Sequence, residues 1–200
     1  TEQFIHNVNT IGIAIMGQTK DLAPADKKLY ALRDVTATVD NMSLIASSIM
    51  SKKLAAGADG IVLDVKTGSG AFMKTEEDSF ALAKEMVKIG NGAGRKTVAV
   101  ISDMDEPLGF AVGNALEVKE AIDTLCGSGP ADFVELCLEL GARMLLVGKK
   151  AKNVEEAKEM LRAVIDNGSA LRKLAEFVAA QGGDAAAIYD TSLLPEASLE

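Results

Sequence analysis

The chain has 200 residues, of which 48% are hydrophobic and 25% are charged, a balance that predicts a globular protein with ample core material. A net charge of −8 argues against a nucleic-acid duplex as partner, and no apolar run approaches the roughly 20 residues that span a membrane. Because Cys126 and Cys137 form no C-x-x-C pair and no signal peptide is visible, we expect reduced thiols in a cytoplasmic protein.

The amino-terminal part of the chain is expected to begin in a helix and then to enter a strand. Residues 2–8 have a helix-like composition, and the apolar run at residues 11–16 ends at Gly17. We interpret this run as a strand. A helix is predicted over residues 27–39, with threonines and valines that weaken its propensity.

The next predicted helix begins at a polar cap and ends at a glycine. Either Asn41 or Ser43 can accept a hydrogen bond from the first turn of this helix, which we expect to run to Gly57. Its apolar residues recur at helical spacing, namely Ile45, Ile49, Met50 and Leu54.

The pattern then changes to that of an α/β layer. Residues 60–66 (GIVLDVK) and 97–102 (TVAVIS) are rich in β-branched side chains and predict two strands. Between them, a sequence close to a capping box at Thr75 opens a long helix that stops at the glycine-rich residues 90–94. A strand, a helix and a second strand predict a parallel crossover unit.

The remainder of the chain is predicted to be mostly helical and to end in coil. Four helices begin near residues typical of helix starts, namely Asn114, Pro130, Asn153 and Ser169. Three strands are too few for an independent α/β sheet. The expected fold class is therefore α/β, with a partial parallel or mixed sheet, flanking helices and truncation at both ends. We expect residues 199–200 to be the remnant of a purification tag.

Arg33, Ser48 and Lys52 form the first candidate site. Ser48 and Lys52 are four residues apart and would share one helix face, which Arg33 can approach from the preceding helix. Together they offer a guanidinium fork, a hydroxyl and an ammonium. This set suits a flat ring with two carbonyls that flank an N–H, as in uracil or thymine. Taken alone, such cations are more often solvated side chains.

Two further segments carry weaker signals. Residues 66–70 (KTGSG) follow a strand, where glycines can let a phosphate approach the backbone, but the pattern is incomplete and a plain turn is the better interpretation. Glu120 could hold a hard cation together with carbonyls of the loop at residues 106–111, although a solvated glutamate is the more common case. Asp64 and Asp103 lie at or near strand ends, and we expect them to serve in caps and turns.

Long ungapped stretches of the sequence resemble the pyrimidine nucleoside phosphorylase and thymidine phosphorylase family. The similarity extends from Ile5 to Pro195 and is carried by the strings PADKKLYALRDVT at residues 24–36, LIASSIMSKK at 44–53, IVLDVKTGSGAFMK at 61–74, ISDMDEPLG at 101–109, GNALEVKEA at 113–121 and AQGGD at 180–184. The resemblance implies an enzyme that uses phosphate to cleave uridine, thymidine or deoxyuridine into the free base and a (deoxy)ribose 1-phosphate.

The resemblance also implies a role for the first candidate site. Arg33, Ser48 and Lys52 would contact the base, with Arg33 and Lys52 as the catalytic pair. Cationic donors that face the pyrimidine carbonyls would stabilise the negative charge that develops as the glycosidic bond breaks. The implied domains are residues 1–24 at the edge of an α/β domain, residues 25–57 as a helical pyrimidine-binding segment, and residues 58–196 in the α/β domain.

By the same resemblance, Leu108 and Ala111 would supply main-chain carbonyls, and Glu120 a carboxylate, to a monovalent cation such as K⁺. Phosphate would be the co-substrate, with no organic cofactor. The partners would be a pyrimidine nucleoside or free base and, in the full-length protein, a second copy in a homodimer, with neither nucleic acid nor a membrane. The family's phosphate loop of KHSTGG type and its TGGT segment do not occur in this chain, so we expect the chain alone to be inactive.

Two alternatives stay open at this stage. A pentosyltransferase of the same architecture, such as anthranilate phosphoribosyltransferase, should show an acidic motif for magnesium and diphosphate, and none is evident. A non-catalytic binding module would keep the base site without the chemistry.

Overall fold

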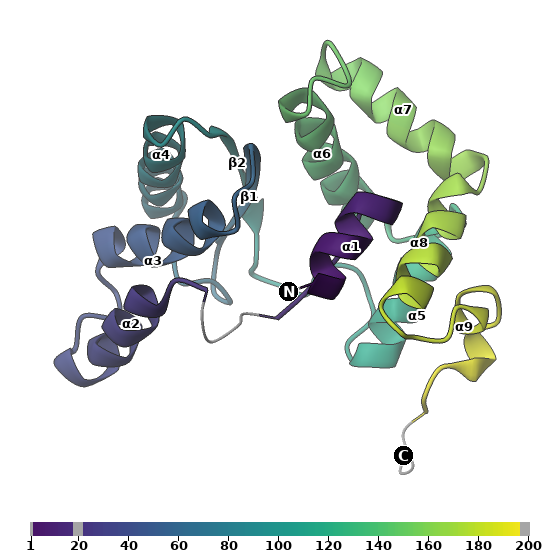
Figure 1. Ribbon diagram of the computed structural model, residues 1–200, viewed down its shortest axis with the longest axis horizontal. Coiled ribbons are helices and arrows are strands. Elements are labelled where there is room, and N and C mark those ends of the chain that lie inside the picture. The colour runs from purple at the N-terminus through teal and green to yellow at the C-terminus, as the bar shows by residue number, and fades with distance from the viewer. Residues whose placement is uncertain (1, 18–21, 197–200) are drawn as a thin grey trace. The chain divides into compact units, whose positions relative to one another are not determined.

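The computed structural model describes residues 2–17 and 22–196 (Figure 1). In chain order the elements are α1 (Glu2–Ile11), α2 (Pro24–Thr36), α3 (Met42–Ala55), β1 (Gly60–Thr67), α4 (Glu76–Gly92), β2 (Lys96–Asp103), α5 (Asn114–Leu125), α6 (Ala131–Val147), α7 (Val154–Asp166), α8 (Ser169–Ala180), α9 (Ala186–Tyr189) and the 3₁₀ helix η1 (Thr191–Leu193). None of the helices in these residues is both long and apolar enough to cross a bilayer.

The chain divides into two compact units, which are described separately. The sheet unit comprises the described residues of Gln18–Pro107 and Glu139–Lys158, and the helical unit comprises those of Thr1–Gly17, Leu108–Leu138 and Glu159–Glu200.

The sheet unit is built on a β1–α4–β2 crossover. The two strands are parallel, with Gly60 opposite Lys96 at one end and Thr67 opposite Asp103 at the other. This arrangement confirms the predicted crossover unit and the α/β class. In the described part of the chain the sheet has these two strands alone.

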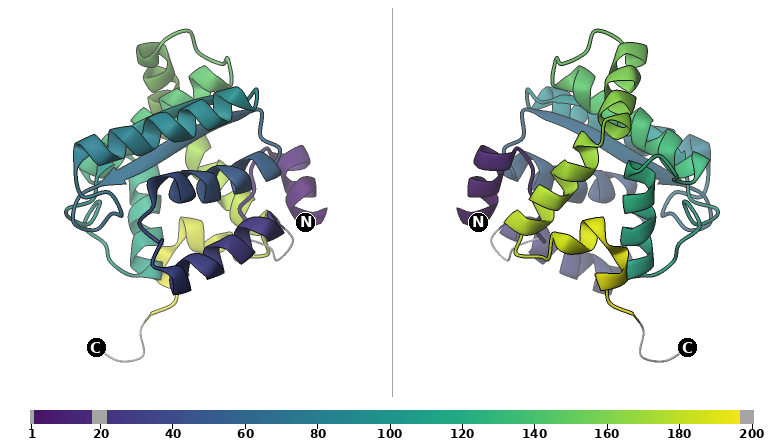
Figure 2. Two further views of the ribbon diagram at one scale, coloured as in Figure 1. Left: turned by 90° about the vertical axis from the view of Figure 1, so that its left-hand side faces the viewer. Right: turned by 90° about the vertical axis from the view of Figure 1, so that its right-hand side faces the viewer.

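The core of the sheet unit lies between β1, α3 and α4. Ile61, Leu63 and Val65 alternate along β1, so their side chains share one face of the strand. They are buried together with Met50 of α3 and Met86 of α4. The left view of Figure 2 shows α4 running along the strands, with α3 below α4 in this view. The segment from α3 to β2 therefore packs around a single hydrophobic core.

The helix starts in this unit follow the predicted caps. Asn41 Oδ1 accepts from the backbone N–H of Leu44 at 3.1 Å, so Asn41 rather than Ser43 caps α3. Thr75 Oγ1 accepts from the N–H of Asp78 at 3.2 Å at the start of α4. Both side chains satisfy N–H groups that lack a partner within the helix.

The predicted boundaries of α2 are shifted by three residues at each end. The helix starts at Pro24, because proline fits the first turn, where no N–H is required. It ends at Thr36, and Ala37 takes a left-handed conformation with φ of 55°. The prediction of a helix to residue 39 was wrong at this end.

The strand predicted over residues 11–16 was wrong. Ile11 is the last residue of α1, and residues 13–17 have no regular secondary structure. Here the side chain of Gln181 makes the backbone hydrogen bonds that a neighbouring strand would otherwise make. Gln181 Oε1 accepts from the N–H of Ile15 at 3.3 Å, and Gln181 Nε2 donates to the Ile15 carbonyl at 2.9 Å. Both backbone groups of Ile15 are thus satisfied without a sheet.

The helical unit has a small core of its own. Ile122 of α5, Ala175 of α8 and Ile188 of α9 are buried against one another. Asn7 of α1 is also buried, and its Nδ2 donates to the carbonyl of Ala180 at 3.1 Å. The prediction that the chain ends in coil was wrong for α9 and η1, because burial of Ile188 gives the short helix a core contact.

Candidate functional site

Arg33 of α2 is a buried side chain that closes the turn between α2 and α3. It is 6% exposed. Its guanidinium donates to the carbonyls of Thr38 and Leu44, at 3.4 Å and 3.5 Å, and to the carbonyl of Val39. The guanidinium carbon lies 5.1 Å from the centre of the Tyr30 ring. Arg33 therefore holds the start of α3 against the end of α2.

Ser48 and Lys52 lie on one face of α3, as their spacing predicts. Lys52 Nζ donates to Ser48 Oγ at 2.9 Å and to Asp26 Oδ2 at 2.7 Å. Ser48 is buried, whereas 27% of the Lys52 side chain is exposed. An ammonium has three N–H donors, so one donor of Lys52 remains for a ligand.

Asp26, in the first turn of α2, is the member of this cluster that sequence analysis missed. Its side chain is 9% exposed. Burial raises the pKa of the Asp26 carboxyl, but the hydrogen bonds from Lys52 and Ser48 and the charges of Lys52 and Arg33 together lower the pKa below its ordinary value. Asp26 is therefore an ionised partner that fixes Lys52 in place.

We call Asp26, Arg33, Ser48 and Lys52 the clamp. The clamp contains two cations and one anion, so its net charge is positive. The hydroxyl of Ser48 and the ammonium of Lys52 lie side by side on α3. The single O–H of Ser48 is used on Asp26, so the donor left for a carbonyl oxygen is the third N–H of Lys52, whose ammonium also stabilises negative charge on that oxygen.

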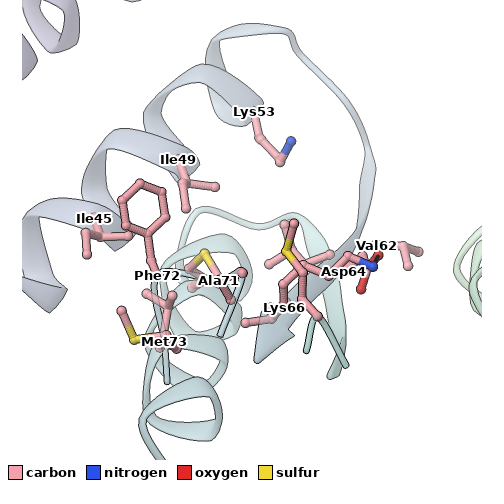
Figure 3. Close-up of a pocket in the computed structure, with 15 residues that line it drawn as sticks. Ile45, Ile49, Lys53, Val62, Asp64, Lys66, Ala71, Phe72 and Met73 are labelled. Atoms are coloured by element: carbon pink, nitrogen blue, oxygen red, sulfur yellow. Dashed lines mark ion pairs between the residues drawn. The ribbon is translucent and has the colours of Figure 1, made fainter. Parts of the chain in front are cut away.

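A pocket of about 460 Å³ lies on the neighbouring stripe of α3 (Figure 3). Ile45, Ile49 and Lys53 line it from α3. Ile49 and Lys53 directly follow Ser48 and Lys52 in the sequence, so the two stripes are about 100° apart around the helix. The pocket and the clamp therefore lie on two different stripes of α3.

The facing wall of the pocket is the segment after β1. Phe72 is 68% exposed, and Figure 3 shows its ring directed toward Ile45 and Ile49. Sequence analysis did not single out Phe72. Two sequence features could have drawn attention to it: aromatic residues make up only 4% of the chain, and Phe72 comes shortly after a glycine-rich turn. The clamp and the pocket together offer donors for polar ring edges and apolar side chains for ring faces.

Asp64 belongs to an ion pair at one end of the pocket. Its Oδ2 lies 2.8 Å from Lys66 Nζ, and Lys66 also donates to Ser102 Oγ at 3.0 Å. The expectation that Asp64 caps a turn was wrong, because Asp64 lies within β1 and its carboxylate pairs with Lys66 of the same strand. Asp103 does serve in a turn, where its Oδ1 accepts from the N–H of Asp105 at 3.1 Å.

The glycine-rich turn that follows β1 has no N–H group to offer a phosphate. Its N–H groups are all bonded within the sheet unit: Gly68 N to Met73 O (3.0 Å), Ser69 N to Asp105 Oδ1 (2.6 Å) and Gly70 N to Met104 O (2.9 Å). This finding supports the interpretation of the segment as a structural turn.

In the helical unit, Glu120 of α5 binds the loop that precedes this helix. Its Oε1 accepts from the N–H groups of Phe110 and Ala111, at 2.9 Å and 3.0 Å. The structure thus brings Glu120 to the loop that contains Leu108 and Ala111, through N–H donors. Glu120 Oε2 accepts no hydrogen bond from a described residue and is a suitable ligand for a hard cation. No three His, Cys, Asp or Glu side chains gather as a metal site in residues 2–17 and 22–196.

Sequence comparisons connect the chain with known enzymes. Residues 1–171 match the family described as glycosyl transferase family, a/b domain. The chain is 64% identical over 196 residues to the pyrimidine-nucleoside phosphorylase of Geobacillus stearothermophilus, a match that covers 98% of this chain and 45% of that protein. It is 61% identical over 199 residues to the pyrimidine-nucleoside phosphorylase of Bacillus subtilis, covering 100% of this chain and 46% of that protein. The chain thus spans about half the length of these curated relatives.

Proposed function

The chain belongs to the glycosyl transferase family through its a/b domain, and on that premise we propose that it is the base-recognition part of a pyrimidine-nucleoside phosphorylase. The enzyme would use phosphate to cleave a pyrimidine nucleoside into the free base and a (deoxy)ribose 1-phosphate. Identities of 64% and 61% to two proteins of that name support the proposal. In it, residues 25–57 form the helical pyrimidine-binding segment, and residues 1–24 and 58–196 belong to an α/β domain.

The observation that carries the proposal is the arrangement of Ser48 and Lys52. As phosphate oxygen bonds to C1′ of the sugar, the bond from C1′ to the pyrimidine nitrogen breaks. Its electron pair stays on the base and is delocalised onto the two ring carbonyls. Donors that face these carbonyls bind the departing base more tightly than the intact nucleoside, which lowers the barrier. No protein nucleophile is needed, because phosphate forms the new bond.

Arg33 has two tasks in this proposal. Three of its N–H groups bind backbone carbonyls, and a guanidinium has five. The remaining donors are available to a ring carbonyl, while the buried stem keeps α3 in place. A donor-rich site also discriminates between bases, since the amino group of cytosine would face like donors.

The pocket beside the clamp suits the faces of the ring. Phe72, Ile45 and Ile49 offer aromatic and aliphatic surface against which a flat ring can pack. A ring placed there would present its edge to the adjacent stripe of α3, where Ser48 and Lys52 lie. Apolar contacts would thus orient the base, and polar contacts would identify it.

A monovalent cation such as K⁺ is also part of the proposal. Glu120 would bind it through the carboxylate, and Leu108 and Ala111 through their main-chain carbonyls. The position of Glu120 against the loop supports this assignment. We further propose a cytoplasmic enzyme that acts as a homodimer.

Substitutions at the clamp test the proposal in the full-length enzyme. Arg33→Ala and Lys52→Ala each remove a charge-assisted contact, so kcat/KM for uridine or thymidine should fall by about 10- to 100-fold. Steady-state assays of sugar 1-phosphate release measure this loss. Lys28→Ala is the matched control, because Lys28 is an exposed lysine of α2 outside the clamp.

Two outcomes would overturn the proposal. Both variants could stay within a factor of about three of wild type, which is below the loss expected for charge-assisted contacts. The wild-type enzyme could instead bind uracil or thymine without releasing sugar 1-phosphate, which would favour a binding module.

A further inference from the structure

Asp105, which follows β2, contacts the glycine-rich turn after β1. Its Oδ1 accepts from the N–H of Ser69 at 2.6 Å, and its carbonyl accepts from Ser69 Oγ at 3.3 Å. Gly68 has φ of +122°, and a Cβ added there would lie 2.7 Å from Asp105 Oδ1. The carboxylate thus takes up the N–H of Ser69 and packs closely against Gly68.

Further contacts attach the turn to the end of β2. Gly70 N donates to the carbonyl of Met104 at 2.9 Å, directly before Asp105 in the sequence. Lys74 Nζ donates to the carbonyl of Ser69 at 2.8 Å. The turn is therefore held by Asp105 and Met104 on one side and by Lys74 on the other.

Asp105 is in the charged state that this hold requires. The N–H and hydroxyl of Ser69 lower the pKa of the Asp105 carboxyl, desolvation raises it by less, and a hydrogen bond at Asp103 and the charge of Lys74 lower it further. The net pKa lies below its ordinary value. The carboxylate is thus ionised at neutral pH, and its hydrogen bond from Ser69 is charge-assisted.

The turn that Asp105 holds is a wall of the pocket. Residues 70–73 and Met104 line the pocket, opposite Ile45 and Ile49 of α3 (Figure 3). Phe72 lies two residues after Gly70, and its ring is 68% exposed, so the backbone of the turn contributes to the position of the ring. The contacts of Asp105 with Ser69 lie three residues before Phe72 in the sequence.

We propose that Asp105 is a positioning residue for pyrimidine binding, which acts by holding Phe72 across the pocket from α3. This inference rests on the proposed function, because it takes the pocket as the place where the pyrimidine ring binds. Asp105 touches no reacting atom in this account. Its loss should weaken nucleoside binding and leave the affinity for phosphate unchanged.

Two variants of the full-length enzyme test this role. Asp105→Ala should raise KM for the nucleoside by about tenfold, as expected for a lost charge-assisted contact, while KM for phosphate and kcat change by less than about threefold. Asp105→Asn should recover most of the loss, because an amide oxygen can still accept from the N–H of Ser69. Glu106→Ala is the control, since the neighbouring Glu106 is exposed and outside the turn.

Hydrogen exchange gives a readout that is independent of activity. The backbone N–H groups of Ser69 and Gly70 should exchange faster in Asp105→Ala than in wild type, and Asp105→Asn should be intermediate. Unchanged exchange, or faster exchange with an unchanged nucleoside KM, would overturn the inference. An equal rise in both KM values, or the same loss in Glu106→Ala, would also overturn it. Wild type without phosphorolysis would instead refute the proposed function, and exchange would still report whether Asp105 holds the turn.

Discussion

At the scale of single residues, the ammonium of Lys52 is the group on which the proposed chemistry depends most. A free lysine side chain loses up to about 2 kcal/mol of rotamer freedom when it becomes ordered. Asp26 at 2.7 Å and Ser48 at 2.9 Å order it in advance. A donor that is already in place can respond to charge as the charge develops, which is the condition for electrostatic stabilisation of a transition state.

The lowered pKa of Asp26 predicts how stability depends on acid. Since the folded-state pKa lies below the ordinary value of 3.8, the carboxylate contributes stability that is fully present above the unfolded-state pKa and is lost as pH falls through the folded-state pKa. The difference in unfolding free energy between wild type and Asp26→Asn should therefore be constant from about pH 8 to about pH 5 and should shrink below about pH 4. Urea unfolding at a series of pH values measures it.

The control for this prediction is Asp34→Asn. Asp34 is an exposed carboxylate of the same helix and has no part in the clamp, so Asp34→Asn should lose stability on acidification in parallel with wild type. A wild-type advantage over Asp26→Asn that grew on acidification would contradict the assignment of Asp26 as the ionised partner of Lys52.

At the scale of elements, the contact between α4 and β2 depends on one glycine. A Cβ added at Gly90 would lie 2.0 Å from Thr97 Oγ1, so Gly90→Ala should force the helix away from the strand and lower the unfolding free energy by about 1–3 kcal/mol. Gly92, in the same helix, has nothing within 4 Å of an added Cβ. Gly92→Ala should be neutral or should stabilise the helix by up to about 1 kcal/mol.

Thermal unfolding of the two alanine variants measures this contrast. Because the substitution and the helix are the same, helix propensity alone would give both variants the same sign. Equal melting temperatures for Gly90→Ala and Gly92→Ala would therefore show that α4 does not pack as closely on β2 as the structure has it.

Local sequence could predict the helices whose first backbone N–H groups are capped by a side chain only a few residues away. Asn41 and Thr75 cap α3 and α4 through residues three positions away, which a short pattern reveals. The run at residues 11–16 was mistaken for a strand because its backbone partner is the side chain of Gln181, far along the chain. Periodicity describes side chains and cannot show which group satisfies a backbone.

In the candidate site, too, only the contacts within one helix could be predicted from the sequence. The spacing of Ser48 and Lys52 brings them together because it is a property of one helix. Asp26 reaches Lys52 across 26 residues, and Phe72 reaches the pocket from another segment. Such contacts arise from tertiary packing, so neither residue could be assigned from spacing alone.

At the scale of the whole molecule, the sheet is smaller than α/β folds require. In the described residues, β1 and β2 pair only with each other, and a parallel sheet usually has more strands with both faces covered. The chain spans 45% and 46% of two curated relatives. The remaining length of such proteins is sufficient to supply further strands.

We predict that the 200-residue chain alone produces no sugar 1-phosphate from uridine or thymidine. The glycine-rich turn has its N–H groups occupied, and the phosphate-loop strings of the family do not occur in the sequence. An assay of the purified chain with phosphate and nucleoside measures this, with the full-length enzyme as the positive control. Product formed in proportion to the concentration of the purified chain would contradict the prediction.

Helix α3 carries residues of both the clamp and the core of the sheet unit. Ser48 and Lys52 lie on the same helix as Met50, which is fully buried against β1 and α4. A base that is held by the clamp binds only while α3 is folded in place, so occupancy of the site must shift the folding equilibrium of the layer behind it. The melting temperature of the sheet unit should therefore rise when a base binds.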